Sequence, residues 1–454
     1  MLVRSHFHPV SGLLMALALL LSGVSLASDF SRGFDAYTEG DFEVAFSTWL
    51  PLAEAGDLSA MYNVALMYDQ GLGVVQNRKL AVRWYRQPAE EGDVSAQYNL
   101  ATIYDYGDGV DEDNRAAIRW YTAAALQADE QAQFNLGVMY GSGEGIDVDF
   151  DAAVHWYLLS ADLGHVAAQY NLGYMYDLGR GVVQDKAVAL FWYRRAASQE
   201  DSDAQYAIAL MHDEGDGVPV DDVAAMTWYE LAAAQGHIKA QFNLAIMHDM
   251  GEGLPEDNLA AVKWYTAAAA QGHRGAQVNL GIMFENGEGI ETDLVEAMRW
   301  YRLAADQGSA EAQYAVALLF DAGEGIAEDN VAAVAWYTLA AEQGDADAQN
   351  NLGAMFDAGE GVDEDDVTAL HWYALAANSG NAIAQNNLGS LYLAGDGAAE
   401  NKVQAHKWFL IAEELGNEVG KKNRVASARL MAVAEITEAE RQARQWLSEF
   451  ESTE

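Results

Sequence analysis

The sequence predicts an all-α fold, an α-solenoid of stacked helix–turn–helix repeats, on three observations. A Trp-Tyr pair recurs with nearly the same neighbours, and its tryptophan returns every 36 residues from Trp84 to Trp408. Apolar residues within each copy recur at the spacings that form one face of a helix. Each copy also carries two glycines one residue apart, which is typical of a helix stop. A fixed period of this size indicates one supersecondary unit stacked on copies of itself.

Composition limits the classes of function. The chain has 454 residues, of which 51% are apolar, and its unbroken period favours a single elongated array with a continuous core over several domains. The net charge of −44 repels phosphate backbones and anionic lipids, so we expect no nucleic-acid partner. Because the chain has no cysteine, it forms no disulfide and no thiolate metal site, and it must be stable by packing alone.

Residues 1–27 are typical of a signal peptide. Arg4 gives a weakly basic start, Leu13 to Leu21 is an apolar run of signal-peptide length, and small residues precede a cleavage site near Ala27 and Ser28. We therefore expect a mature chain that begins near Ser28, has no membrane span, and is periplasmic or secreted. An uncleaved membrane anchor is the alternative, because the wider apolar zone approaches the ~20 residues that a membrane-spanning helix needs.

The two ends of the array are predicted to be irregular. Residues 28–56 predict an N-terminal repeat or cap, with a tight turn at Gly40-Asp41 and a second helix that carries Trp49. Residues 417–454 predict a C-terminal helical cap, in which Thr437 to Glu440 has the capping-box spacing before a last amphipathic helix. Ten repeats of 36 residues occupy residues 57–416.

Each repeat is predicted to contain two helices joined by the glycine loop. In the first helix Ala168, Leu172 and Met175 lie on one face, which we assign to the core. The second helix is predicted to bury its tryptophan and tyrosine, and it usually ends at a glycine. Ala128 and Glu200 replace that glycine in two copies, and there we expect a less regular turn.

These motifs resemble the Sel1-like repeat, a branch of the helical-repeat class related to tetratricopeptide repeats. The matching patterns are Ala-Gln-x-Asn-Leu-Gly-x-Met-Tyr, then Gly-x-Gly-Val/Ile, then Ala-x-x-Trp-Tyr-x-x-Ala-Ala-x-x-Gly, over about residues 56 to 416. The resemblance implies a right-handed α-solenoid that acts as an adaptor or scaffold for other proteins, in bacteria often exported to the periplasm. It implies no catalytic residues. Some exported relatives rich in cysteine have been associated with penicillin binding, but this chain has no cysteine.

The candidate partner-binding surface lies on the first helices, opposite the core stripe. Resemblance to the tetratricopeptide class implies that this side lines a concave groove, in which asparagines can hold the backbone of an extended peptide. The alternative is that the asparagines bond neighbouring backbone and the aromatic rings pack between repeats. The predicted groove residues are Tyr98, Asn99, Phe134, Asn135, Tyr170, Asn171, Tyr206, Phe242, Asn243 and Tyr314.

A calcium loop is a weaker candidate. Asp147, Asp149 and Asp151 suggest one, but Ala152 and Leu158 stand where an EF-hand needs its glycine and its bidentate glutamate. N-capping and solubility therefore explain these aspartates better.

Other acidic and histidine residues are also given structural interpretations. The acidic cluster between Asp357 and Asp366 is interpreted as diffuse cation attraction or as a docking patch for a basic partner. His212 and His248 stand where other copies carry tyrosine or phenylalanine, so they are predicted to be core substitutions rather than metal ligands. We predict no metal site, no cofactor and no catalytic residue, because the phosphate-loop, zinc-protease and nucleophile motifs are missing.

The leading hypothesis for function is an exported, non-enzymatic adaptor or scaffold that binds a protein or peptide partner through the concave face, in envelope regulation or assembly. The chain is devoted almost wholly to repeat packing, and its side chains vary at the groove positions. One alternative is an envelope hydrolase or penicillin-recognising enzyme, which requires a nucleophile beside a matching base. Another is a secreted factor that interacts with a host.

Overall fold

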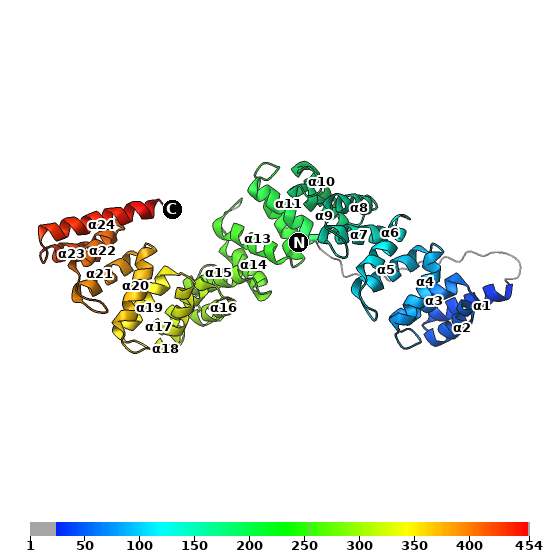
Figure 1. The fold of residues 1–454 in the computed structure, drawn as a ribbon, viewed down its shortest axis with the longest axis horizontal. Helices are drawn as coiled ribbons and strands as arrows, with labels where there is room; N and C mark the ends of the chain where they lie inside the picture. Colours follow the sequence, from blue (N-terminus) through cyan, green and yellow to red (C-terminus); the bar gives the residue numbers. More distant parts are fainter. Residues whose placement is uncertain (1–23, 254, 453–454) are drawn as a thin grey trace. The chain divides into compact units, whose positions relative to one another are not determined.

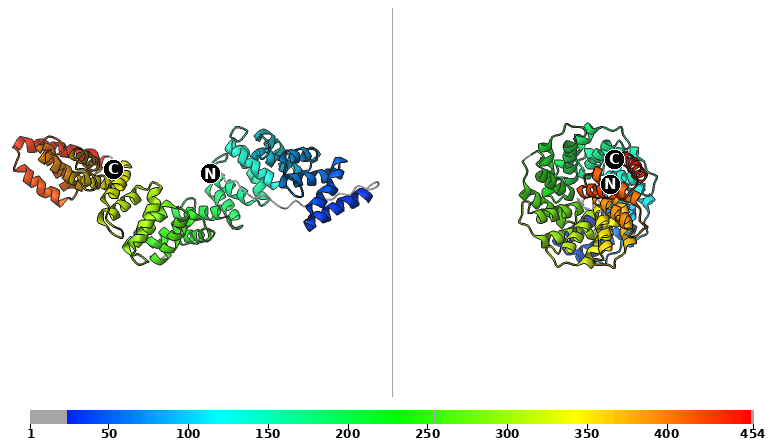
Figure 2. Two further views of the ribbon diagram at one scale, coloured as in Figure 1. Left: turned by 90° about the horizontal axis from the view of Figure 1, so that it is seen from below. Right: turned by 90° about the vertical axis from the view of Figure 1, so that its left-hand side faces the viewer.

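The computed structural model describes residues 24–253 and 255–452, and every regular element within them is an α-helix. The predicted all-α fold is therefore confirmed. By its internal contacts the chain divides between Ala232 and Ala233 into two compact units. Each unit is a series of stacked helix pairs, seen in Figure 1 and from two further directions in Figure 2. Residues 1–23, which hold most of the predicted signal peptide, lie outside the described residues.

Each repeat consists of a first helix, which we call the A helix, and a second, the B helix. The A helices are α3 (Leu58–Gln70), α5 (Val94–Tyr106), α7 (Glu130–Ser142), α9 (Val166–Leu178), α11 (Ser202–Glu214), α13 (Ile238–Met250), α15 (Arg274–Asn286), α17 (Ala310–Ala322), α19 (Ala346–Ala358) and α21 (Ala382–Ala394). The B helices are α4 (Arg78–Glu90), α6 (Asn114–Ala125), α8 (Phe150–Asp162), α10 (Lys186–Ala197), α12 (Asp222–Ala234), α14 (Asn258–Ala270), α16 (Leu294–Asp306), α18 (Asn330–Glu342), α20 (Asp366–Asn378) and α22 (Lys402–Glu414). Before the repeats lie α1 (Val24–Glu39) and α2 (Phe42–Glu54), and after them α23 (Glu418–Ala428) and α24 (Val433–Glu451).

The turn after each B helix needs a residue in the left-handed conformation, which glycine adopts without steric cost. Ala128, with φ of 64°, and Glu200, with φ of 66°, adopt this conformation too. The expectation of a less regular turn is confirmed in part, because α6 and α10 end one residue earlier than the other B helices, at Ala125 and Ala197. The two copies nevertheless keep the left-handed residue and carry backbone strain there, which costs roughly 1–2 kcal/mol per residue.

The core is divided into clusters that lie at the joints between repeats. One such cluster contains Tyr157 of α8, Leu172 and Met175 of α9, and Trp192 of α10. The tryptophan of one repeat thus belongs to the same core cluster as the B-helix tyrosine of the repeat before it. The tyrosine of the pair is the more deeply buried residue, since Tyr121 is fully buried whereas Trp120 is half-buried.

The A helix approaches this tyrosine so closely that some copies need glycine there. A Cβ atom added to Gly173 of α9 would lie 2.7 Å from Cδ1 of Tyr193. Real Cβ contacts are not that short, so the ring would have to move. Glycine at this point of the A helix is therefore a packing requirement of the neighbouring B helix.

The C-terminal end of the second unit is covered by α24, which packs on α22 (Figure 1). The ring of Trp446 lies 5.7 Å from that of Trp408 and stacks on Phe450 at 4.8 Å. The capping box predicted at Thr437 is wrong, because α24 begins four residues earlier, at Val433. There Glu435 accepts a hydrogen bond from the backbone N–H of Ala432 at 2.7 Å.

A ladder of glutamines joins neighbouring repeats. Gln97 on α5 donates from Nε2 to the carbonyl oxygen of Ala89 at 2.9 Å, and its Oε1 accepts from Nε2 of Gln127 at 3.0 Å. Amides shared in this way satisfy buried polar atoms that would otherwise destabilise the joint. The same bond between side chains, at 2.7–2.9 Å, links Gln199 to Gln169, Gln271 to Gln241, Gln307 to Gln277 and Gln343 to Gln313.

The ladder is interrupted where the second glutamine is replaced. Ser379 stands at one such position, and the buried Oε1 of Gln349 has no hydrogen-bond partner among the described residues. Leu163 and Leu415 leave the Oε1 atoms of Gln133 and Gln385 in the same situation.

Ser379→Gln is expected to stabilise the protein by roughly 0.5–1.5 kcal/mol, because its amide would donate to Gln349. The backbone there, with φ of −82° and ψ of 7°, matches that of Gln343, with φ of −84° and ψ of −2°. Urea unfolding followed by circular dichroism measures the change. Ser379→Met is the matched control, since it adds similar length without the amide, and equal shifts in the two variants would contradict the hydrogen-bond explanation.

Histidines serve as N-caps of A helices. The backbone N–H of Ala168 donates to Nδ1 of His165 at 3.1 Å, and His237 and His273 cap their helices in the same way. Only a neutral imidazole can accept this bond through Nδ1. Burial lowers the pKa of His165 to about 4, from 6.5, so the ring stays neutral at physiological pH.

Stability is expected to fall as the pH falls from about 6.5 to 4, because the unfolded chain then binds a proton at His165 that the folded chain resists. Above pH 6.5 the contribution is fully present, and at most roughly 3 kcal/mol is lost across the window. Asparagine caps α21 through Asn381 at 2.8 Å, so His165→Asn keeps a cap that does not titrate. Denaturant unfolding at several pH values should show a shallower loss in this variant.

His155→Asn is the control, because His155 is exposed. If both variants follow the wild-type profile between pH 6.5 and 4, the cap is not responsible for the acid sensitivity.

Candidate functional site

The aromatic residues predicted to line a groove pack against the B-helix tyrosine of their own repeat. The ring of Tyr98 lies 5.8 Å from that of Tyr121, and the ring of Tyr170 lies 5.7 Å from that of Tyr193. These rings therefore pack within a repeat, and Phe134 and Phe242 also contact the next one through His165 and His273, so the alternative interpretation is confirmed in part. The same pairing, at 5.8–6.0 Å, joins Phe134 to Tyr157, Tyr206 to Tyr229, Phe242 to Tyr265 and Tyr314 to Tyr337.

Two of the predicted groove residues, Phe134 and Asn171, are buried, so the prediction is wrong for them. Phe134 is 1% exposed, and the imidazole of His165 stacks on it at 4.5 Å. Asn171 is 0% exposed, and neither atom of its amide has a hydrogen-bond partner among the described residues. Neither side chain can contact a partner in this conformation, because neighbouring helices cover both. The other eight predicted residues are half-buried and thus partly accessible.

The half-buried asparagines bond tyrosine hydroxyls rather than neighbouring backbone. Nδ2 of Asn99 donates to the hydroxyl of Tyr85 at 3.2 Å and lies 3.4 Å from that of Tyr62. Burial raises the pKa of Tyr98 to about 12, while its hydrogen bond with Asn135 acts in the opposite direction. The asparagines thus hold the repeats together, and Asn243 likewise stands half-buried on α13.

These tyrosine hydroxyls also donate to a carboxylate, and this link was missed by the sequence analysis. Nδ2 of Asn279 donates to the hydroxyl of Tyr265 at 2.9 Å, and that hydroxyl donates to Asp249 at 3.1 Å. Burial raises the pKa of Tyr265, so the hydroxyl remains a donor at neutral pH. The signal was an acidic residue 16 positions before the tyrosine in most copies. Read alone, each of these acids resembles ordinary surface charge.

A second set of partly exposed apolar residues lies four positions after the aromatic, on the same face of each A helix. Leu318, which follows Tyr314, is 37% exposed. Together they form what we call the A-helix row. In the first unit the row consists of Tyr62, Leu66, Tyr98, Tyr170, Tyr174, Tyr206 and Leu210, and in the second of Phe242, Ile246, Ile282, Tyr314 and Leu318.

One pair of side chains has the elements of a nucleophile and a base, but its burial prevents that chemistry. Nδ1 of His406 lies 2.9 Å from Oγ of Ser427, and the two residues are 1% and 0% exposed. The Oγ atom also donates to the carbonyl oxygen of Arg424 at 3.0 Å. The hydroxyl is therefore held by backbone and closed to a substrate, so this pair gives no support to the hydrolase alternative.

The remaining candidates are the acidic loop and two histidines, and they lie in ordinary elements of the repeats. Asp149 of the acidic loop is the N-cap of α8 and accepts from the N–H of Ala152 at 2.9 Å. His212 and His248 are half-buried on A helices. Within residues 24–253 and 255–452, no group of three or more His, Asp or Glu residues is arranged to hold a metal ion. In the same ranges, no helix has both the length and the apolar character needed to cross a membrane.

Comparison with known proteins places these features in a family. The Sel1 repeat matches the chain in ten segments, which are residues 58–93, 94–129, 130–165, 166–201, 202–237, 238–273, 275–309, 310–345, 346–381 and 382–417. A comparison with curated proteins found no match.

Two solved structures are similar over most of the chain. One is a protective antigen present in uropathogenic Escherichia coli strains, which displays an SLR fold. It is 32% identical, covers 89% of this chain and 94% of its own, and has a TM-score of 0.65. The other is a Sel1 repeat protein from Oxalobacter formigenes, 33% identical, which covers 68% of this chain and 89% of its own, with a TM-score of 0.54. With its repeated motifs, its stacked helix pairs and these matches, the chain belongs to the Sel1 repeat family.

Proposed function

We propose that this protein is an exported, non-enzymatic adaptor that binds a segment of a partner protein along the A-helix row. The observation that carries the proposal is the row itself: partly exposed aromatic and aliphatic side chains recur along a Sel1 repeat solenoid, a fold that serves as a protein-interaction scaffold. Apolar side chains that remain exposed in a regular series are typical of an interaction surface. The scaffold fold is typically non-catalytic, which supports an adaptor role.

The packing beneath the row suits it to binding. The aromatic rings of the row other than Tyr174 lie against a buried tyrosine whose hydroxyl is hydrogen-bonded, as Tyr314 lies against Tyr337 and Tyr337 bonds Asn351 at 3.2 Å. Such rings lose little conformational freedom when a partner binds, because they are already held in place. An extended peptide or a loop could therefore contact several repeats at a small entropic cost.

The double variant Tyr206→Leu, Leu210→Lys is expected to reduce partner capture by roughly tenfold, because it removes an aromatic contact and adds a charge to the row. Leucine keeps apolar packing against Tyr229, so the melting temperature should fall by only a few degrees. Capture from the native envelope, quantified by mass spectrometry, measures the effect.

The matched control is Phe191→Leu, Leu231→Lys, on exposed B-helix positions of the same unit. Loss of the same captured proteins in both variants, or in neither, would reject the A-helix row as the binding surface.

Export is part of the proposal and has its own test. The apolar N-terminus supports it, and so does the similar E. coli protein, which is a protective antigen. We expect the intact mass of the protein purified from its native host to correspond to a chain that begins near Ser28. A mass that includes residues 1–27 would contradict signal cleavage and favour the uncleaved anchor.

A secreted host-interaction factor is the second candidate, and the antigen character of the E. coli relative favours it. The two candidates differ in where the protein accumulates. Periplasmic protein after osmotic shock supports the envelope adaptor, whereas protein in the culture medium without cell lysis supports the secreted factor.

A further inference from the structure

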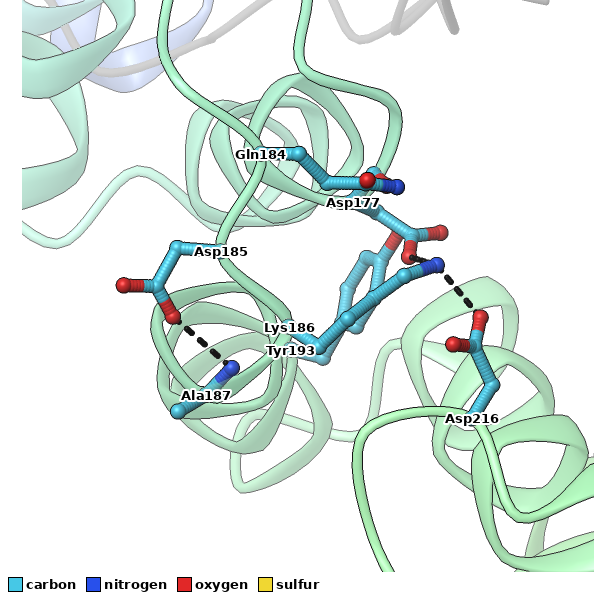
Figure 3. A network of polar contacts seen from close by, with 7 residues as sticks. All are labelled: Asp177, Gln184, Asp185, Lys186, Ala187, Tyr193 and Asp216. Carbon is cyan, nitrogen blue, oxygen red and sulfur yellow. Dashed lines mark hydrogen bonds and ion pairs between the residues drawn. The ribbon is translucent and has the colours of Figure 1, made fainter.

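In the first unit, a lysine binds two carboxylates from neighbouring repeats (Figure 3). Nζ of Lys186, the first residue of α10, lies 2.6 Å from Oδ1 of Asp177 at the end of α9 and also contacts Oδ2 of Asp216. Asp216 stands between the two glycines of the next loop. The lysine side chain is 23% exposed, so this ion pair is better shielded from water than an ordinary surface pair.

The same arrangement occurs three repeats earlier. Arg78, the first residue of α4, lies 2.9 Å from Asp69 and 2.6 Å from Asp108. These residues precede Lys186, Asp177 and Asp216 by 108 positions, which is three repeat lengths. The pair of carboxylates is therefore a recurring binding place for one cationic side chain.

Repeat packing places the second carboxylate of each pair in the same way. The glycine after it packs on the first residue of the preceding B helix, so an added Cβ on Gly217 would lie 2.2 Å from Lys186. In the second unit, a Cβ added to Gly289 would lie 2.4 Å from Asn258, and one added to Gly361 would lie 2.2 Å from Asn330. The loop acid thus stands beside the same position of the B helix whether or not that position carries a cation.

A tyrosine hydroxyl fixes the first carboxylate of each pair. Tyr193 donates to Asp177 at 3.3 Å in the pair that holds Lys186. In the second unit Tyr337 donates to Asp321 at 3.1 Å, and Tyr373 donates to Asp357 at 3.4 Å. The carboxylates that lack an internal cation are therefore held by the same contact as the one that has it.

The second unit retains these acid pairs but lacks the cation. Asn258, Leu294, Asn330 and Asp366 stand where Lys186 stands in the first unit. None of the carboxylates concerned forms an ion pair among the described residues. We call them the acid pairs. They are Asp249 with Glu288, Glu285 with Glu324, Asp321 with Glu360 and Asp357 with Asp396.

Positive charge is scarce in the sequence around the last acid pairs. Burial raises the pKa of Asp357, and the charges of Asp366 and Asp396 raise it further. Residues 303–401 contain no lysine or arginine but 17 aspartates and glutamates. Like charges that interact in this way destabilise one another until a cation neutralises them.

We propose that the acid pairs of the second unit bind lysine and arginine side chains of a basic protein segment, each cation taking the place that Lys186 occupies in the first unit. This surface lies at the glycine loops and is separate from the A-helix row, so it goes beyond the adaptor function proposed above. The bound cation would join two carboxylates of neighbouring repeats, as Lys186 does. A basic segment that follows the loops would engage one pair per repeat.

The test uses the full chain and a fluorescein-labelled octapeptide of alternating lysine and glycine, at about 150 mM salt to screen diffuse attraction. The variant Asn330→Lys, Asp366→Lys supplies internal cations to two acid pairs. Its affinity for the peptide, from fluorescence anisotropy, is expected to fall by roughly tenfold, because each internal ammonium group excludes one from the peptide.

The matched control is Ala335→Lys, Glu342→Lys, which adds the same charge at exposed positions of the same region. It is expected to weaken binding by less than about threefold, through screened long-range attraction only. An equal loss in both variants would overturn the proposal and leave diffuse attraction as the explanation.

Two further variants keep the test decisive. Glu360→Gln, Asp396→Asn removes the acids without adding lysine and should weaken binding as strongly as Asn330→Lys, Asp366→Lys, even if the latter folds poorly. Lys186→Met should strengthen binding only slightly, by about 1.25-fold, because it adds one pair to four. Titration with Ca²⁺ alone tests whether a metal ion occupies the acid pairs instead. Calcium binding that Asn330→Lys, Asp366→Lys abolishes, with peptide binding unchanged, would assign the acid pairs to a metal ion and overturn the proposal.

Discussion

The buried tyrosine of each B helix is the residue on which the rest of the array depends. Its ring fills the space that the small residue of the A helix leaves, as Tyr193 does beside Gly173, and it supports the aromatic residue of the A-helix row. Its hydroxyl joins an asparagine of the next repeat to an acid of its own repeat, as in Asn279, Tyr265 and Asp249. One side chain thus sets the distance between helices, positions the row and holds the first carboxylate of each acid pair.

Periodicity made the fold predictable from the sequence. A signal repeated ten times averages out local ambiguity, so the helix pairs and the glycine stops followed from spacing alone. The misplaced start of α24 is a case without such averaging, because it occurs once. At Ala128 and Glu200 the turn is only slightly altered, because the stacked repeats impose the left-handed residue and these side chains accept the strain.

The candidate site was less predictable, because exposure depends on neighbours that no single helix reveals. Tyr98 and Phe134 occupy equivalent positions, yet the first is partly accessible and the second is covered by His165 of the next cap. Asn171 looked like its equivalents, but Gly141 stands in its joint where other copies carry the acid. Hydrogen bonds between residues 14 and 16 positions apart cross helices, so amphipathic patterns do not show them.

The two surfaces differ in what they would recognise. The A-helix row offers apolar contact and aromatic rings that are already held in place. It therefore favours a partner of complementary shape that buries apolar surface. The acid pairs offer charge at fixed intervals, which favours fast association and selects against acidic partners. A partner that carries both an apolar segment and a basic one would engage the two surfaces at once, and its affinity would exceed either contact alone.

The interrupted glutamine ladder has a mechanical consequence. In a linear array each repeat contacts only its neighbours, so resistance to extension is set joint by joint. Where Leu163, Ser379 or Leu415 stands, a joint lacks one bond between side chains that the others have. Under tension, slippage would begin at these joints, and the protein would lengthen in blocks while the intervening repeats stayed folded.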